Sequence, residues 1–448
     1  MMAMILGNGT VVTGGERPEV LADGAVAWQG DRIEAVDRTA ALRARWPEAE
    51  LVDARGGLIL PGFVNLHHHF YSALGRGLDP GFAPRGFGEV LEGLWWRLDR
   101  SLDAQAVRVS ARLTLAACVR WGCTTVFDHH ASPSCIAGSL DAIADEVAKA
   151  GLSAVLCYEA SDRNGHDEAI AGVEENADFC RRRLAHPTIR GVMGLHASFT
   201  VADETLAATA RQRPAGVGVH LHVAEDPLDI RVSTALYGSG PVQRLEAAGL
   251  LDDRALLAHG IHLSPDDVDR VAAAGAVLIH NPESNANNGV GRLDLVAAHR
   301  AGCRLALGTD GMGSSMLAGL RFAFLAHRAA HRDPRIGFEV HPGLLAQTSR
   351  AAGAFLDQPL LGELTAGAPA DIAVVDAPPP TPIGPDSLFG HLVYGAAGAA
   401  VRHTVARGRL LMRDFELLTV DLEEAAREAQ EIAPRVWERF RALPMPTH

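Results

Sequence analysis

The feature that most constrains the fold of this chain is a series of eight short apolar segments in its central part. We expect strands at 59–66, 124–129, 153–159, 189–196, 217–223, 255–261, 276–281 and 305–309. Amphipathic helical stretches, such as 104–121 and 265–274, lie between most of these segments. Eight strand–helix units predict a parallel (β/α)8 barrel, in which the active site lies at the carboxyl ends of the strands.

The two ends of the chain show a different pattern. Residues 1–58 alternate apolar and polar side chains between glycine turns, and similar alternation returns at 371–376 and 401–412. Alternation with a period of two is typical of antiparallel strands, so the two ends are expected to pair. The predicted α/β organisation is an N-terminal part of a small β-sandwich (1–58), a TIM-like barrel (59–361), the C-terminal part of the sandwich (362–415) and a final helix (416–448).

Composition and charge disfavour several classes of protein. Of the 448 residues, 41 are Lys or Arg and 54 are Asp or Glu, which gives a formal net charge of −13. Without a basic stripe, nucleic acid and anionic membranes are disfavoured as partners. No apolar run is long enough to span a membrane, and the N-terminus lacks the features of a signal peptide. We therefore expect a cytoplasmic protein, whose six scattered cysteines are reduced thiols.

Polar side chains recur where the predicted strands end. His67 and His69 end the first strand, and alternate residues of a strand point to the same side of it. The preceding residues are apolar, so both imidazoles would be buried, where a metal ion offsets the cost of burying polar rings. Polar residues at the other strand ends are His129, His130, His196, His222, Glu225, His259, His280 and Asp310, while His220 is expected one layer deeper in the core.

Three of these residues suggest specific chemical roles. Glu225 lies just past the fifth strand, where a carboxylate is placed for proton transfer, although a helix cap is the alternative. Asp310 lies between small residues after the eighth strand and could bind a metal without crowding. His259, at the end of the sixth strand, would orient a water molecule or stabilise developing charge, unless it is purely structural.

Other residues are expected to shape a substrate pocket. His196 ends the fourth strand and is free to contact substrate, while His280 is equally compatible with a structural role. Trp95 lies in the long connection 70–100, where packing under a loop and contact with substrate are both possible. The only lysine, Lys149, precedes the third strand, so it cannot bridge two metal ions at the fourth, and a single ion is favoured.

Taken together, these motifs resemble the amidohydrolase superfamily, and within it the deaminase and chlorohydrolase branch, over nearly the full length of the chain. The nearest likeness within that branch is to the SsnA-type aminohydrolases, which are linked to selenium and purine metabolism. The matching segments are 61–69, 222–225, 259–260, 280–285, 308–311 and 362–371 for the branch, and 67–72, 94–100 and 128–133 for the SsnA type.

The resemblance implies a ligand set and a reaction. His67, His69, His222 and Asp310 would hold one divalent metal ion, zinc in the first place and iron as the alternative. The reaction would be hydrolytic deamination of a nitrogen heterocycle such as a purine or a pterin, with release of ammonia. The implied residue roles are proton transfer by Glu225, His259 and Asp310 and substrate binding by His196, His280 and Trp95.

Several alternatives stay open at this point. The leaving group could be chloride or an alkylamine from a triazine-type ring, since the metal chemistry is shared. Hydrolysis of an amide or cyclic imide is disfavoured by the missing lysine, and a non-catalytic scaffold by the complete set of expected ligands. Glu225 argues for deamination, because an amine needs protonation to leave more than chloride does. A homodimer is the family-level expectation for the assembly.

Overall fold

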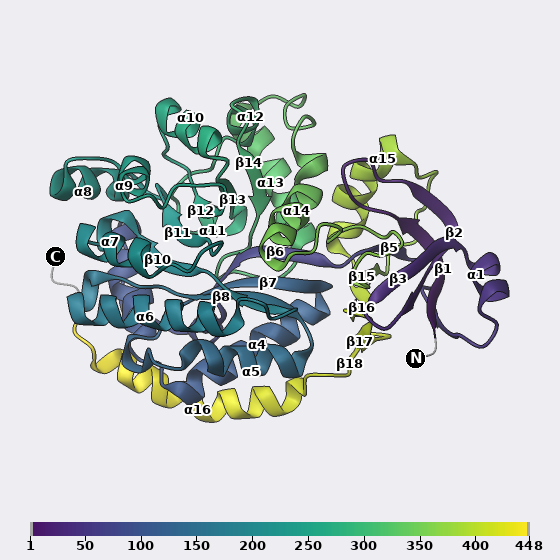
Figure 1. Cartoon of the computed structure of the whole chain (residues 1–448), viewed down its shortest axis with the longest axis horizontal. Coiled ribbons are helices and arrows are strands. Elements are labelled where there is room, and N and C mark those ends of the chain that lie inside the picture. Colours follow the sequence, from purple (N-terminus) through teal and green to yellow (C-terminus); the bar gives the residue numbers. More distant parts are fainter. Residues whose placement is uncertain (1–2, 446–448) are drawn as a thin grey trace.

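The computed structural model describes residues 3–445, and its larger part is a barrel of parallel strands surrounded by helices (Figure 1). One parallel sheet runs in the order β6-β7-β8-β9 and a second in the order β10-β11-β12-β13-β14. Their bounds are β6 (Phe63–His68), β7 (Cys123–His130), β8 (Ser153–Tyr158), β9 (Ile189–Gly191), β10 (Met193–Ala197), β11 (Val219–Val223), β12 (Ala255–His259), β13 (Val277–His280) and β14 (Arg304–Leu307).

Isolated backbone bridges connect the two sheets at both of their junctions. A parallel bridge joins His68 to Asp310 beyond β14, and another joins Ala160 beyond β8 to Leu195 in β10. Because β9 and β10 are separated by Val192 alone, they occupy one strand position, and the barrel has the eight positions that the sequence predicts. The predicted TIM-like barrel is confirmed.

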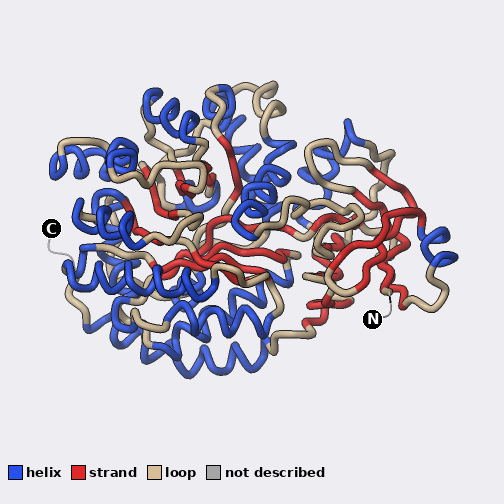
Figure 2. Tube along the Cα trace, viewed as in Figure 1, coloured by secondary structure: helices blue, strands red, loops and turns tan. Residues whose placement is uncertain are grey.

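Helices cover the outside of the barrel and bury its apolar strands (Figures 1 and 2). Several begin at side-chain caps: the Asp103 carboxylate accepts the backbone N–H of Ala106 at the start of α4, and Ser264 and Asp267 form a capping box on α10. The helices are α4 (Ala104–Arg120), α5 (Ser139–Ala150), α6 (His166–Arg183), α7 (Asp203–Gln212), α8 (Pro227–Tyr237), α9 (Pro241–Ala247), α10 (Pro265–Ala274), α11 (Pro282–Asn287), α12 (Leu295–Arg300), α13 (Met316–His331) and α14 (Leu344–Leu356).

The connection between β6 and α4 is helical rather than an open loop. Its second half is continuous from residue 87 to 99 through α2 (Phe87–Val90), a π-helical turn η2 (Leu91–Trp95) and α3 (Trp96–Asp99). π-Helical turns are rare and occur frequently at functional sites. The 3-10 turns are η1 (Phe70–Gly75), η3 (Pro133–Cys135), η4 (Asp162–Asn164), η5 (Ser198–Thr200), η6 (His341–Gly343) and η8 (Ala396–Gly398).

Both ends of the chain form one nine-stranded sheet beside the barrel (Figure 2). The order is β18-β17-β16-β15-β5-β1-β2-β3, with β4 also paired to β1, so the sheet is a single branched network. Trp28 fixes the junction, since its indole N–H donates to the carbonyl of Gly408 at 2.9 Å. The strands are β1 (Met4–Val12), β2 (Val20–Gln29), β3 (Arg32–Arg38), β4 (Glu50–Asp53), β5 (Leu58–Pro61), β15 (Ile372–Val375), β16 (Val401–Ala406), β17 (Arg409–Arg413) and β18 (Glu416–Leu417).

The predicted small β-domain built from both chain ends is therefore confirmed, with one refinement at its border. The segment expected as one strand at 59–66 is divided by Pro61-Gly62 into β5, which pairs antiparallel with β15, and β6, which belongs to the barrel. The remaining helical elements are α1 (Thr39–Arg45), α15 (Pro385–Gly390), η7 (His391–Gly395) and α16 (Leu422–Ala442). None of the helices within residues 3–445 combines the length and apolar composition needed to cross a bilayer.

Candidate active site

A cavity opens at the carboxyl ends of the barrel strands, between them and the helical connection after β6. Aromatic side chains from that connection, Trp95 and Trp96, form part of its wall together with Phe199. Most of its polar lining follows the strand ends, as expected for a parallel barrel. The polar lining includes His69, Glu159, His196, His222, Glu225 and Asp310.

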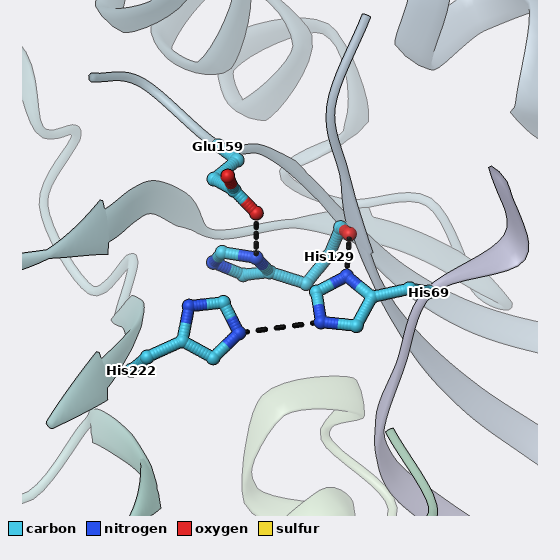
Figure 3. A group of neighbouring side chains, drawn as sticks. All are labelled: His69, His129, Glu159 and His222. Carbon is cyan, nitrogen blue, oxygen red and sulfur yellow. Dashed lines mark hydrogen bonds and ion pairs between the residues drawn. The ribbon is translucent and has the colours of Figure 1, made fainter. Parts of the chain in front are cut away.

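Two histidines at the base of the cavity are held by backbone carbonyls. The Nδ1–H of His69 donates to the carbonyl of His129 at 2.5 Å, and the Nδ1–H of His222 donates to that of His196 at 2.8 Å. Because a neutral imidazole carries one proton, both Nε2 atoms are then unprotonated. They lie 3.2 Å apart (Figure 3). Two facing lone pairs at this distance indicate a place for a cation.

His67 and Asp310 complete this group, which we call the histidine–aspartate cluster (His67, His69, His222 and Asp310). The Nε2 atom of His67 is fully buried without a hydrogen-bond partner among residues 3–445, and it lies 3.8 Å from Oδ1 of Asp310. The same Oδ1 lies 3.0 Å from Nε2 of His69. The other oxygen, Oδ2, accepts the hydroxyl of Ser284 at 2.6 Å, which fixes the carboxylate.

The donor set fits a zinc-type ion. Three imidazole nitrogens and one carboxylate oxygen converge from three parts of the barrel, and each imidazole has its Nδ1 atom held from outside the cluster. Such outer contacts orient metal-binding histidines. Burial lowers the pKa of His69, but the hydrogen bond and charge of Asp310 outweigh burial and raise it to about 9. The position therefore favours a positive charge, which a metal ion or a proton can supply.

Backbone hydrogen bonds at the junction of β14 with β6, which we call the barrel seam, position Asp310. The amides of Thr309 and Asp310 both donate to the carbonyl of His67, at 3.1 and 2.9 Å, and so tie the end of β14 to β6. Asp310 and His259 have positive φ angles of 55° and 76°, which are unusual for residues other than glycine. Strained backbone of this kind clusters at functional sites, where the surrounding structure maintains it.

Glu225 and His259 form an acid–base pair beside the cluster. Nε2 of His259 lies 3.4 Å from Oε2 of Glu225 and 3.8 Å from Oδ2 of Asp310. The ring is oriented by its Nδ1–H, which donates to Oδ1 of Asn285 at 2.8 Å. Burial and the charge of Asp310 raise the pKa of Glu225 well above its ordinary value. Glu225 is thus held as a neutral acid, a state suited to proton donation near neutral pH.

A second polar group lies at the cavity, and sequence reasoning identified only its two histidines. We call it the Glu159 group (His129, Glu159, Arg163 and His196). Oε2 of Glu159 lies 3.3 Å from Nδ1 of His129, and Oε1 lies 3.5 Å from Arg163 (Figure 3 draws the first pair). Glu159 follows β8 directly, so the rule that identified the other strand-end residues could have found it. Arg163, in the loop beyond, carried no such signal.

The three predicted substrate-contact residues fall in two places. His196 and Trp95 line the cavity. His280 does not, because the ring at the end of β13 lies in a separate small cavity with Arg292 and His327. Burial lowers the pKa of His280 to about 3, so the ring is neutral. The structure therefore brings together the predicted residues of the cluster, Glu225 and His259 with His196 and Trp95, but leaves His280 apart.

Comparison with known proteins gives two sequence matches to families. A profile of the amidohydrolase family matches residues 58–411, and one of an imidazolonepropionase-like composite domain matches residues 24–49. The 5-methylthioadenosine/S-adenosylhomocysteine deaminase of Moorella thermoacetica is 31% identical over 412 residues, covering 90% of this chain and 93% of the relative. The enzyme of that name from Haloarcula marismortui is 32% identical over 443 residues, covering 96% and 98%.

Solved structures share the fold at lower identity. An adenosine deaminase from Xanthomonas campestris with bound zinc superposes with a TM-score of 0.83 at 24% identity and covers 99% of both chains. A mutant atrazine chlorohydrolase from Arthrobacter aurescens, complexed with zinc and atraton, gives a TM-score of 0.80 at 23% identity and covers 96% of this chain and 100% of that one. These likenesses concern the whole architecture, barrel and terminal sheet together.

Proposed function

This chain belongs to the amidohydrolase family, and from that premise we propose that it deaminates a nitrogen heterocycle by metal-assisted hydrolysis. The family resemblance read from the motifs is confirmed, and so is the assignment to a hydrolytic aminohydrolase. The more specific likeness to SsnA-type proteins rests on the quoted segments. The finer statements below, on metal, residue roles, leaving group and assembly, are our proposal.

The histidine–aspartate cluster would hold the metal ion. Zinc is proposed first, since imidazole and carboxylate ligands in a buried four-donor set suit it, and iron is the alternative. When bound, such an ion lowers the pKa of a coordinated water molecule and so supplies a nucleophile near neutral pH. The fit rests on the unpartnered, buried Nε2 atom of His67 and on the facing Nε2 atoms of His69 and His222.

The proposed roles of the protein groups follow from their protonation. Glu225, neutral in its buried position, donates its carboxyl proton to the ring nitrogen next to the carbon that water attacks. Asp310 and the Nε2 atom of His259 orient the water and accept its proton. The proton taken from water by Asp310 or His259 then passes through the Glu225 carboxylate to the departing amino group, which leaves as ammonia. The remaining hydroxyl proton of the attacking water returns to Glu225 as the carbonyl forms. His196 and Trp95 are proposed to contact the ring.

The single observation that carries this proposal is the buried Glu225 carboxyl group, 3.4 Å from His259 and beside Asp310, where burial and the Asp310 charge raise its pKa and so favour the protonated form. An amine leaves a tetrahedral carbon only after protonation, whereas chloride leaves without it. A triazine-type chlorohydrolase or alkylaminohydrolase remains the second candidate, and the shared fold with an atrazine chlorohydrolase is the observation that favours it. A non-catalytic scaffold is disfavoured by the convergence of all four proposed ligands with the acid–base pair.

The decisive test is ammonia release by the zinc-loaded protein from purines, pterins, pyrimidines, triazines and adenosyl nucleosides. Glu225→Gln should lower the rate by about 10²–10⁴-fold, the usual contribution of a general acid. Asp421→Asn is the matched control, because that exposed carboxylate caps α16 outside the cavity and asparagine caps equally well. Chloride or alkylamine release without ammonia would overturn deamination in favour of the second candidate.

The assembly and location are proposed more simply. We propose a cytoplasmic homodimer that acts on a small heterocyclic substrate without a nucleic-acid or membrane partner. The acidic charge of −13 supports the last point, because it disfavours anionic polymers and surfaces. Light scattering coupled to gel filtration tests the dimer, and a mass of one chain of 47.4 kDa would contradict it.

A further inference from the structure

The Glu159 group places a buried carboxylate, that of Glu159, at the wall of the cavity. The Glu159 side chain is only 3% exposed, and its pKa is held well below the ordinary value because its contacts with His196, His129 and Arg163 outweigh the effect of burial. Its contacts are 3.3 Å to His129, 3.5 Å to Arg163 and 3.8 Å to His196. Charge-assisted hydrogen bonds are shorter, at about 2.7–2.9 Å. The carboxylate is therefore ionised and has room for a closer donor.

His196 adds a second acceptor next to this carboxylate. Its Nδ1 atom lies 2.6 Å from the hydroxyl of Thr200, and that hydroxyl already donates to the carbonyl of Ala197 at 3.1 Å. Nδ1 of His196 must then be the donor, which leaves Nε2 as a lone pair. Oε1 of Glu159 and Nε2 of His196 thus form adjacent acceptors, 3.8 Å apart.

No basic side chain is free to receive an anion here. Among the described residues that line the cavity, Arg163 is the only Lys or Arg. One of its terminal nitrogens is paired with Asp99 and the other lies 3.5 Å from Glu159, while the guanidinium stacks 5.3 Å from the ring of Trp96. Its side chain is 7% exposed. The carboxylates of the lining are Glu159, Glu225, Asp226, Asp229 and Asp310.

We infer that the substrate is an uncharged or cationic heterocycle that presents N–H or O–H donors to Glu159 and His196, and that anionic substituents are excluded. This inference rests on the proposed function and narrows its substrate class. Aromatic side chains, Trp95, Trp96 and Phe199, supply apolar walls for a flat ring. Of the two compounds in the relatives' name, 5-methylthioadenosine lacks a carboxylate and S-adenosylhomocysteine carries one, so this chain should separate them.

Binding to zinc-loaded Glu225→Gln protein tests the inference without turnover. Calorimetry would compare matched ligands without and with an anionic substituent: adenosine with its monophosphate, guanosine with its monophosphate, and methylthioadenosine with adenosylhomocysteine, which carries an ammonium group beside its carboxylate. Guanine is included as a free base. We expect each neutral member to bind at least tenfold more tightly than its anionic counterpart. Free bases and nucleosides together distinguish ring N–H donors from sugar hydroxyl donors. This comparison needs no change at Glu159, so it does not depend on the folding of a further variant.

Adding Glu159→Gln to the same protein should lower the affinity for the neutral ligands about tenfold, roughly the contribution of one charged hydrogen bond. It should also reduce the preference for neutral over anionic ligands. Adding Asp421→Asn instead, which removes an equal charge from the exposed cap of α16 outside the cavity, should leave both unchanged. Equal binding of anionic ligands, no binding of any neutral or cationic ligand, or an unchanged preference in folded Glu159→Gln protein would overturn the inference. Neutral ligands that bind but release no ammonia from native enzyme would overturn only the proposed function.

Discussion

The histidine–aspartate cluster and the Glu159 group border the same cavity but are built differently. In the cluster, backbone carbonyls or a further imidazole hold each Nδ1 atom, so that three Nε2 atoms converge on one point. In the Glu159 group, a carboxylate is surrounded by contacts that are too long to satisfy it fully. This contrast indicates that the histidine–aspartate cluster is suited to bind a metal ion, whereas the Glu159 group is suited to accept hydrogen bonds from a ligand.

The largest effect is expected from a change in the cluster itself. Asp310→Asn removes the carboxylate charge that faces His67, His69 and His259, and activity should fall by about 10²–10⁴-fold, as for a group essential to proton transfer. Metal content per chain, measured by mass spectrometry, should fall in parallel. If the cluster is not the metal site, metal content will be unchanged in this variant. Glu159→Gln will then lower activity more than Asp310→Asn does.

The outer support of the cluster should matter less. His220→Phe removes the ring whose Nε2 atom lies 2.9 Å from Nδ1 of His67, and metal affinity should fall about 10–100-fold, as for other outer partners of metal-binding histidines. Titration against a chelator measures this. His130→Phe is the control, since that buried ring contacts Ser132 instead. Equal affinities in the two variants would show that His67 needs no such support.

The barrel seam gives a smaller, structural effect. A methyl group at Gly308 would lie 2.4 Å from Oδ1 of Asn281 and 2.8 Å from Cβ of His67. Gly308→Ala should therefore destabilise the fold by about 1–3 kcal/mol and weaken metal binding, since β14 must move away from β6. Urea unfolding measures the first effect. Gly319→Ala, where the nearest atom is 3.7 Å away, should be neutral or stabilising, and a loss there would contradict the steric argument.

The smallest expected effect is a pH-dependent change in KM that acts through the Glu159 group. Burial raises the pKa of Asp99 to about 6, although the charge of Arg163 opposes this, and the charge of Glu159 adds to it. As pH falls through 6, Asp99 gains a proton and Arg163 is balanced by Glu159 alone. KM for an uncharged substrate should then rise several-fold between pH 7 and pH 5. Asp99→Asn should hold KM at the higher value throughout, and a pH profile identical to that of native enzyme would refute the coupling.

Sequence reasoning located the strands of the barrel but not every residue of the site. Period and apolar runs identified all eight strand positions, since each depends on neighbouring residues alone. His67 and His69 were visible because their spacing places both on one strand face. Glu159 and Arg163 were missed, and His280 proved to lie outside the cavity. Neighbouring residues in the sequence do not show which side chains each of these three residues contacts or which cavity it faces.

The sequence by itself determined the family, the barrel, the terminal sheet and the residues at the strand ends, because short-range patterns encode them. Only the tertiary structure decided which nitrogen of each imidazole faces the cavity, since the carbonyls that fix His69 and His222 come from other strands. It also decided that Arg163 is occupied by Asp99 and Glu159. Charge and protonation depend on what burial places within a few ångströms, and burial is a property of the folded chain.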